Sequence, residues 1–184
     1  MVAVRQVTAL FGLSGVGKTT LARRVADACP EFIHAEGGAL LASALHLERD
    51  QLRLSPPETI RRNQQILVQA FDALRQQHPG RPVLFEGHLI IDNGMTLVEV
   101  PVEVVRALRP EILIWVFDDP SVIAKRRSES SRVRPARPAH ELASQQTRGE
   151  HLCREYALKL EIDFVRVHAE ADEELMQLMR ARTN

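Results

Sequence analysis

The chain has 184 residues, and its 24 Lys and Arg balance 24 Asp and Glu. Apolar residues make up 45% and charged residues 26%, an ordinary globular composition that fits one domain. The balanced charge excludes a whole-molecule basic field, so DNA and membranes are not expected partners. Two cysteines are too few for a disulfide scaffold, and we expect a soluble, reduced, cytoplasmic protein.

Short apolar runs alternate with amphipathic stretches along the chain. The runs do not alternate polar and apolar residues, which is typical of parallel strands that are buried on both faces. They lie at Val7–Leu13, Glu31–His34, Pro82–Glu86, Ile112–Phe117 and Phe164–Val167. Strands that alternate with helices predict an α/β fold with right-handed crossovers.

The amphipathic stretches between these runs predict the helices. We expect helices at Thr19–Ala28, from Ser55 to Pro79, from Pro120 onward, and at Leu142–Leu160. The sequence Ser55-Pro56-Pro57-Glu58 has the pattern of a capping box with prolines in the first turn. Asp118 or Asp119 is the expected N-cap of the helix that begins at Pro120.

Residues 12–19 read G-L-S-G-V-G-K-T and match the phosphate-loop pattern G-x-x-x-x-G-K-[ST] between a strand and a helix. The glycines let successive N–H groups face phosphate oxygens. Lys18 would reach the β- and γ-phosphates of ATP, and the Thr19 hydroxyl would hold Mg²⁺. The expected nucleotide contacts are Gly12, Ser14, Gly15, Val16, Gly17, Lys18, Thr19 and Thr20.

A phosphate loop predicts a nucleotide but does not define the reaction. The chain lacks the guanine-reading N-K-x-D of switch GTPases and an ABC-type signature, and its length leaves little room for an AAA+ lid domain. Between Ser121 and Arg137 there are six cations and one anion. These features favour a small kinase, with one domain over residues 1–184, a basic lid loop at about 128–138 and a small polyanionic ligand.

Four segments resemble one family: the phosphate loop, Ala39–Leu45, Glu86-Gly87-His88 and Arg132-Val133-Arg134. They resemble the adenylate-kinase-like P-loop kinases, and most of all the archaeal-type adenylate kinases. The resemblance implies a five-stranded parallel sheet with helices on both faces and a short Arg-rich lid. It also implies phosphoryl transfer from ATP and Mg²⁺ to a nucleoside monophosphate.

The resemblance gives several residues a role near the transferred phosphoryl group. The expected catalytic residues are Lys18, Arg132, Arg134 and Glu86. Glu86 would also hold the metal with Thr19, or it is simply a solvated carboxylate at a strand end. Arg126 would stack on adenine, or it lies on a solvated helix face.

The acceptor side departs from the family pattern. Where the family has an Arg that binds the acceptor phosphate, this chain has Ala42. Where the archaeal-type pattern has a second Arg, this chain has Asp92. The expected substrate residues are Gly37, His88, Asp92 and Arg154, and the replacement cations are Arg53, Arg61 and Arg62. Each of three residues has an alternative interpretation. Gly37 would mark a tight turn, and His88 is equally consistent with a structural role. Arg154 would pair with Glu150 on the same helix. The acceptor is therefore AMP or another small, hydroxyl-bearing molecule; a regulatory ATPase module without an acceptor is the alternative.

Overall fold

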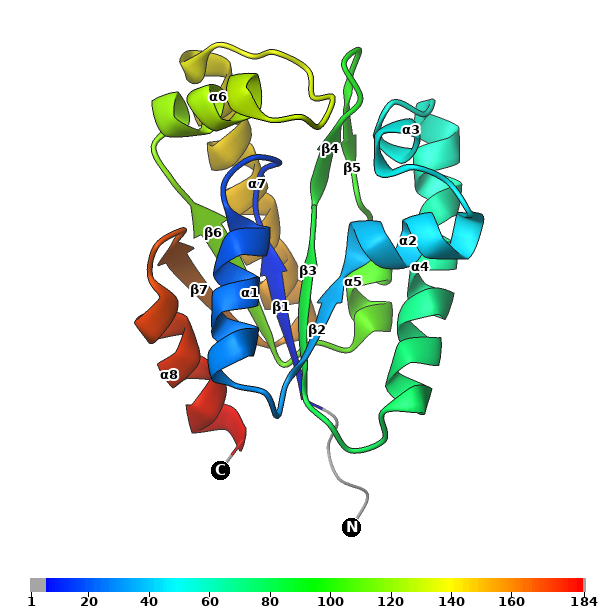
Figure 1. Cartoon of the computed structure of the whole chain (residues 1–184), viewed down its shortest axis with the longest axis vertical. Coiled ribbons are helices and arrows are strands. Elements are labelled where there is room, and N and C mark those ends of the chain that lie inside the picture. The colour runs from blue at the N-terminus through cyan, green and yellow to red at the C-terminus, as the bar shows by residue number, and fades with distance from the viewer. Residues whose placement is uncertain (1–5, 184) are drawn as a thin grey trace.

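A five-stranded parallel sheet forms the centre of the molecule, in the order β2-β3-β1-β6-β7 (Figure 1). The computed structural model describes residues 6–183. The strands are β1 (Val7–Phe11), β2 (Ile33–Glu36), β3 (Val83–Gly87), β6 (Ile112–Phe117) and β7 (Asp163–His168). This confirms the α/β fold with a five-stranded parallel sheet that was expected from the sequence.

The central strands are the most apolar part of the sheet. Every residue of β1 is buried, and Leu10 pairs with Glu86 of β3 on one side and Ile114 of β6 on the other. The edge strands β2 and β7 are more exposed. Because all five strands are parallel, their carboxyl ends meet at one edge of the sheet, where ligands bind in such folds.

Helices cover both faces of the sheet (Figure 1). They are α1 (Lys18–Ala28), α2 (Gly37–Leu45), α3 (Arg49–Arg53), α4 (Pro57–Gln77), α5 (Val102–Leu108), α6 (Pro120–Glu129), α7 (Ala139–Leu160) and α8 (Asp172–Thr183). Helices α1 and α8 pack together on one face, and α7 packs against β6 on the other. Helices α2 and α4 pack against each other. Among the residues described, no helix is long and apolar enough to cross a membrane.

A β-hairpin not predicted from the sequence follows β3. It consists of the antiparallel strands β4 (Ile90–Asp92) and β5 (Leu97–Glu99). The Asn93 side chain closes the turn by accepting hydrogen bonds from two backbone N–H groups, at 3.0 and 2.8 Å. Gly94 has a φ of 92°, a conformation that favours glycine. Strands this short leave too little periodicity to be recognised in a sequence.

Two expectations about element ends were wrong. Strand β2 runs from Ile33 to Glu36 instead of Glu31–His34, because the chain is still turning at Glu31, where the Phe32 N–H donates to the Cys29 carbonyl. The capping box at Ser55 does not form, since the Ser55 hydroxyl donates to the Gln51 carbonyl in the preceding helix.

The start of α6 agrees with the sequence, which predicted no end for this helix. Asp119 is the N-cap and accepts a hydrogen bond from the Ser121 N–H at 2.7 Å. The helix continues to Glu129, so the irregular part of the predicted lid loop is limited to residues 130–138, which we call the α6–α7 segment. This segment contacts α3, where the Val133 N–H donates to Asp50 Oδ2.

Candidate active site

The phosphate loop lies between β1 and α1, as its sequence pattern predicted. Gly15 and Gly17 have φ values of 86° and 112°, which residues with a side chain rarely adopt. The Lys18 side chain is buried, and its ammonium donates to the carbonyls of Gly12 and Leu13 at 2.9 and 2.8 Å. The loop is thereby curled around the lysine that is expected to meet the phosphates.

Arginines of α6 brace this loop from outside. Arg127 Nε donates to the Ser14 carbonyl at 2.8 Å, and Arg126 Nη1 donates to the Val16 carbonyl at 2.8 Å. Arg126 also pairs with Asp118 at 2.5 Å, which fixes its guanidinium beside the loop. Two of the six cations between Ser121 and Arg137 thus support the phosphate loop from α6, outside the lid loop predicted at about 128–138. Stacking of Arg126 on adenine stays a prediction.

Cations crowd the space in front of the loop. Burial, and after it the charges of Arg53, Arg127 and Arg134, lower the pKa of Lys18 to about 7, although Glu86 raises it. Burial also lowers the pKa of Arg127 to about 10. Positive groups held this close together, in surroundings that disfavour their charge, indicate a site for a polyanion.

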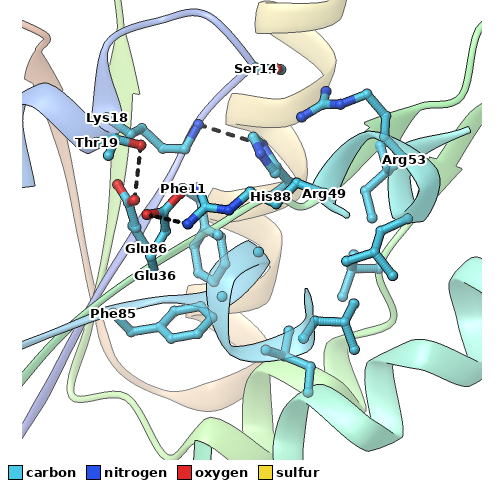
Figure 2. Close-up of a pocket in the computed structure, with 18 of the residues that line it drawn as sticks. Phe11, Ser14, Lys18, Thr19, Glu36, Arg49, Arg53, Phe85, Glu86 and His88 are labelled. Carbon is cyan, nitrogen blue, oxygen red and sulfur yellow. Dashed lines mark hydrogen bonds and ion pairs between the residues drawn. The ribbon is translucent and has the colours of Figure 1, made fainter. Parts of the chain in front are cut away.

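Glu86 and Thr19 face each other beside the phosphate loop (Figure 2). The Thr19 hydroxyl donates to Glu86 Oε1 at 2.9 Å, and His34 Nε2 lies 3.6 Å from the same oxygen. Burial alone would raise the pKa of Glu86, but His34 and Lys18 outweigh it and lower the pKa. Glu86 is therefore ionised. Its second oxygen, Oε2, is buried and has no hydrogen-bond partner among the described residues.

His88 links the end of β3 to the phosphate loop. Its Nδ1 lies 3.0 Å from the Gly12 carbonyl and 3.5 Å from Lys18 Nζ. Burial, and then the charge of Lys18, hold the pKa of His88 well below its usual range. The imidazole is therefore neutral, and Nδ1–H donates to the carbonyl. This contact supports a structural role, and a direct contact with the acceptor stays a prediction.

A cavity of about 400 Å³ opens beside the phosphate loop (Figure 2). One end holds Lys18, Thr19 and the acids of two strand ends, Glu36 and Glu86. The other end is enclosed by α2, α3, α4 and α5. Helices α2, α4 and α5 line it mainly with aliphatic side chains, and α3 adds Arg49, Asp50 and Arg53 beside Leu52. The cavity is therefore polar where a γ-phosphate would lie and mainly apolar beyond it.

Four polar residues of the acceptor side were not assigned to the site from sequence. Glu36 ends β2 and forms an ion pair with Arg49, and both line the cavity. Asn63 and Gln64 of α4 also line it and are 6% exposed. The strand end at Glu36 was missed because β2 was placed two residues too early. Nothing in the local sequence marked the two amides.

The predicted nucleotide residues mostly line the cavity. Those at the cavity wall are Ser14, Gly15, Gly17, Lys18, Thr19, Thr20 and Arg126. Gly12 and Val16 belong to the loop but do not line the cavity. A Cβ on Gly12 would approach the Val116 carbonyl to 2.6 Å. Arg132 and Arg134 line the cavity from the α6–α7 segment, and Arg134 Nε donates to Ser14 Oγ at 3.0 Å.

Only part of the predicted acceptor set is brought to the cavity. Gly37 and His88 line it, and a side chain at Gly37 would press on Phe85 and the Glu86 carbonyl. Asp92 does not, because Arg137 binds its carboxylate through two hydrogen bonds, at 2.9 and 3.1 Å.

Arg154 and two of the replacement cations also lie away from the cavity. Arg154 is exposed on α7, pairs with Glu150 at 3.4 Å and stacks on Phe164. Arg61 and Arg62 are exposed on α4 and do not line the cavity, whereas Arg53 does. Of the three arginines expected as replacements, Arg53 alone is therefore positioned to face a ligand.

The parallel sheet and the loop at residues 12–19 define a P-loop protein. The family model described as an AAA domain matches residues 11–143, and the chain belongs to this family. The match runs from the end of β1 into α7. It does not test the expected lack of a separate AAA+ lid domain, which stays a prediction. No curated protein is similar enough to this chain to count as a match.

Several solved kinase structures share the fold. Shikimate kinase from Acinetobacter baumannii, in complex with shikimate, is 12% identical with a TM-score of 0.66 over 98% of this chain and 96% of that chain. Shikimate kinase from Bacteroides thetaiotaomicron is 14% identical with a TM-score of 0.60 over 97% and 98%. A sugar kinase from Janibacter sp. is 22% identical with a TM-score of 0.54 over 98% and 94%. At these identities the similarity establishes the fold.

Proposed function

We propose that this protein is a phosphotransferase that moves the γ-phosphoryl group of ATP to a small molecule bound in the cavity. The observation that carries the proposal is the continuity of the cavity with the phosphate loop, where Lys18, Arg132 and Arg134 line the same space. A nucleotide on the loop would present its terminal phosphate to whatever fills the cavity. The shared fold with shikimate and sugar kinases supports this assignment.

Thr19 and Glu86 suit Mg²⁺, the ion that ATP normally carries. Mg²⁺ prefers oxygen ligands and takes one or two from the protein, with phosphates and waters completing its shell. The unpartnered Oε2 of Glu86 lies beside the Thr19 hydroxyl and is the kind of oxygen such a shell needs. No cluster of three or more His, Cys, Asp or Glu that fits a metal occurs among the described residues, which agrees with a metal held mainly by the nucleotide. The bound ion would neutralise charge on the phosphates.

The proposed reaction has a simple balance. The acceptor hydroxyl oxygen forms a bond to the γ-phosphorus, and the bond from that phosphorus to the β–γ bridging oxygen breaks. ADP leaves with the electron pair. The proposed acceptor of the hydroxyl proton is Glu36, whose carboxylate lines the cavity in an ion pair with Arg49, because Glu86 is assigned to the metal together with Thr19. Lys18, Arg132 and Arg134 stabilise the charge on the transferred group.

The α6–α7 segment is the proposed lid. Arg134 already reaches the phosphate loop through Ser14, and Arg132 is exposed at the cavity wall. Closure over bound ATP would bring both guanidinium groups to the phosphates and exclude water. The segment is attached at its far end by the ion pair between Arg137 and Asp92.

The resemblance to archaeal-type adenylate kinases makes AMP one possible acceptor, and the cavity favours an acceptor that carries a hydroxyl without a phosphate. Nucleoside monophosphate kinases place cations around the acceptor phosphate. Here Ala42 replaces one, and the other candidate, Asp92, is bound to Arg137 outside the cavity. We therefore propose a small alcohol as the acceptor.

The test is ADP formation from ATP and Mg²⁺ with and without candidate acceptors. A phosphotransferase forms ADP faster with its acceptor than with water alone, and Lys18→Ala removes the stimulated rate. A regulatory ATPase without an acceptor would show the same slow rate with every candidate. That result would contradict the proposal and favour the alternative.

A further inference from the structure

The end of the cavity away from the phosphate loop is built mainly from aliphatic side chains. Its walls include Leu41 of α2, Leu52 of α3, Ile60 and Leu67 of α4, and Val104 and Leu108 of α5. The hydroxyls of a sugar or another polyol would find few partners there, and each buried hydroxyl without a partner weakens binding. This end therefore suits an apolar body.

Two amide side chains interrupt this apolar wall, and they differ in their hydrogen bonding. Ile60, Asn63, Gln64 and Leu67 are spaced at i, i+3, i+4 and i+7, so they share one face of α4, and all four line the cavity. The Gln64 amide donates to the Ile60 carbonyl at 3.1 Å. Within residues 6–183 the Asn63 side chain forms no hydrogen bond or ion pair, although it is only 6% exposed.

Asn63 is absent from the set of fully enclosed polar atoms that lack a partner, so its amide has accessible surface, and that surface faces the cavity. An apolar residue at this position of α4 would fit the rest of the stripe better. Since Asn63 lines the cavity, the group that would satisfy it is one carried by the bound molecule. An amide can both donate to and accept from such a group.

The cations near the acceptor side lie toward the phosphate end. Arg53 is close enough to Lys18 and Arg134 for its charge to act on them, and Arg49 is bound by Glu36. Arg53 itself has no hydrogen bond or ion pair among the described residues, so it is available for the transferred phosphoryl group. Among the described helices that enclose the far end, α2, α4 and α5 contribute no cation to the lining, whereas α3 contributes Arg49 and Arg53. The walls formed by α2, α4 and α5 therefore offer no partner to a second anionic group.

We propose that the acceptor is a compact, uncharged alcohol with a largely apolar body and one further hydrogen-bonding group, which Asn63 recognises. This inference rests on the proposed phosphotransferase function. It assigns the hydroxyl to the polar end, beside Glu36, and the ring or branched body to the aliphatic end. Asn63 is then the residue that determines which apolar alcohols are accepted.

The first experiment measures kcat/KM for ADP formation with five probes: benzyl alcohol, its para-carboxamide derivative, glucose, shikimate and AMP. We expect both aromatic alcohols to exceed glucose, shikimate and AMP by at least about tenfold, with the carboxamide the better of the two. Stimulation by glucose, shikimate or AMP in place of the aromatic alcohols would overturn this inference and leave the phosphotransferase function intact. No stimulation by any probe would contradict the function itself, and with it this inference.

The second experiment compares Asn63→Leu with Gln65→Leu, which places the same side chain on an exposed position of the same helix. We expect Asn63→Leu to lose the preference for the carboxamide, about tenfold in KM, while its thermal midpoint stays equal or rises. Gln65→Leu should change neither. Asn63→Asp keeps the shape but loses the donor, and it should also lose the preference. A lower thermal midpoint in Asn63→Leu with the preference intact would show that Asn63 is structural and overturn the proposal.

Discussion

The two ends of the cavity are built in opposite ways. At the phosphate end, several polar groups bind one another: Lys18 binds two carbonyls, Thr19 binds Glu86, and Arg134 binds Ser14. Glu86 Oε2 and the Arg53 guanidinium have no hydrogen-bond partner among the described residues. At the far end, aliphatic side chains surround Asn63, whose amide faces the cavity and has no hydrogen bond among the described residues. The phosphate end is thus held in shape by its own contacts and keeps Glu86 Oε2 and Arg53 for its ligands. The far end offers the ligand an aliphatic wall and the amide of Asn63. This difference separates the chemistry from the choice of acceptor.

The difference predicts that each end can be damaged without the other. Lys18→Ala breaks the phosphate end, and we expect the rate of phosphoryl transfer to fall by about 10³-fold or more, because a buried positive charge at the γ-phosphate is lost. The circular dichroism melt should stay within a few degrees of wild type, since the ammonium packs against no core residue. Lys125→Ala, on the exposed side of α6, is the matched control and should be silent.

Near-normal turnover in Lys18→Ala would contradict the assignment of residues 12–19 as a phosphate loop. We expect Lys18→Ala to leave the far end intact, so the variant should still bind the para-carboxamide alcohol, as measured by calorimetry. Loss of alcohol binding together with turnover would mean that the two ends are not separable.

The two arginines of the α6–α7 segment that line the cavity, Arg132 and Arg134, give a second test of the phosphate end. Arg132→Ala and Arg134→Ala should each lower kcat by about 10²-fold with a smaller change in the KM for ATP, because these groups act on charge that develops in the transition state. Arg61→Ala, an exposed arginine away from the cavity, is the control. A pure KM effect in both variants would instead make the segment a clamp for ground-state ATP.

The ion pair between Asp92 and Arg137 joins the segment to the hairpin, and we expect the smallest effect there. Burial alone would raise the pKa of Asp92, but hydrogen bonds from Arg137 and the Gly94 N–H lower it below its ordinary value of 3.8. Asp92→Asn should reduce the free energy of unfolding at neutral pH by about 1–3 kcal/mol and change kcat only a few-fold.

The pH dependence of this effect has a definite sign. A carboxylate whose pKa is lowered by folding stabilises the native state above its unfolded pKa, and this contribution disappears as the pH falls through the folded pKa. Urea unfolding of wild type and Asp92→Asn should therefore differ at neutral pH and converge in acid. A difference that stays constant into acid would show that the ion pair is not its source. Asp92→Arg should give no AMP activity, since position 92 does not line the cavity.

The sequence predicted the sheet and the phosphate end because both are encoded locally. Buried apolar runs mark parallel strands, and residues 12–19 are contiguous, so spacing alone identifies the loop. The far end draws residues from four helices, α2, α3, α4 and α5. The spacing within α4 places its residues on one face, but no spacing connects one helix with another. Asp92 was assigned to the acceptor because nothing in the sequence indicated that Arg137 binds its carboxylate. Glu36 was missed because a shift of two residues in β2 decides which side chain ends the strand.

The central claim is that the terminal phosphoryl group of ATP passes to an organic hydroxyl in the cavity. Phosphorus NMR of wild-type protein with ATP, Mg²⁺ and the para-carboxamide benzyl alcohol tests it most directly, with Lys18→Ala as the reference. The account predicts a phosphate monoester signal that grows in step with ADP in the wild type and is absent in the variant. Inorganic phosphate alone, formed at the same rate with and without the alcohol, would contradict it.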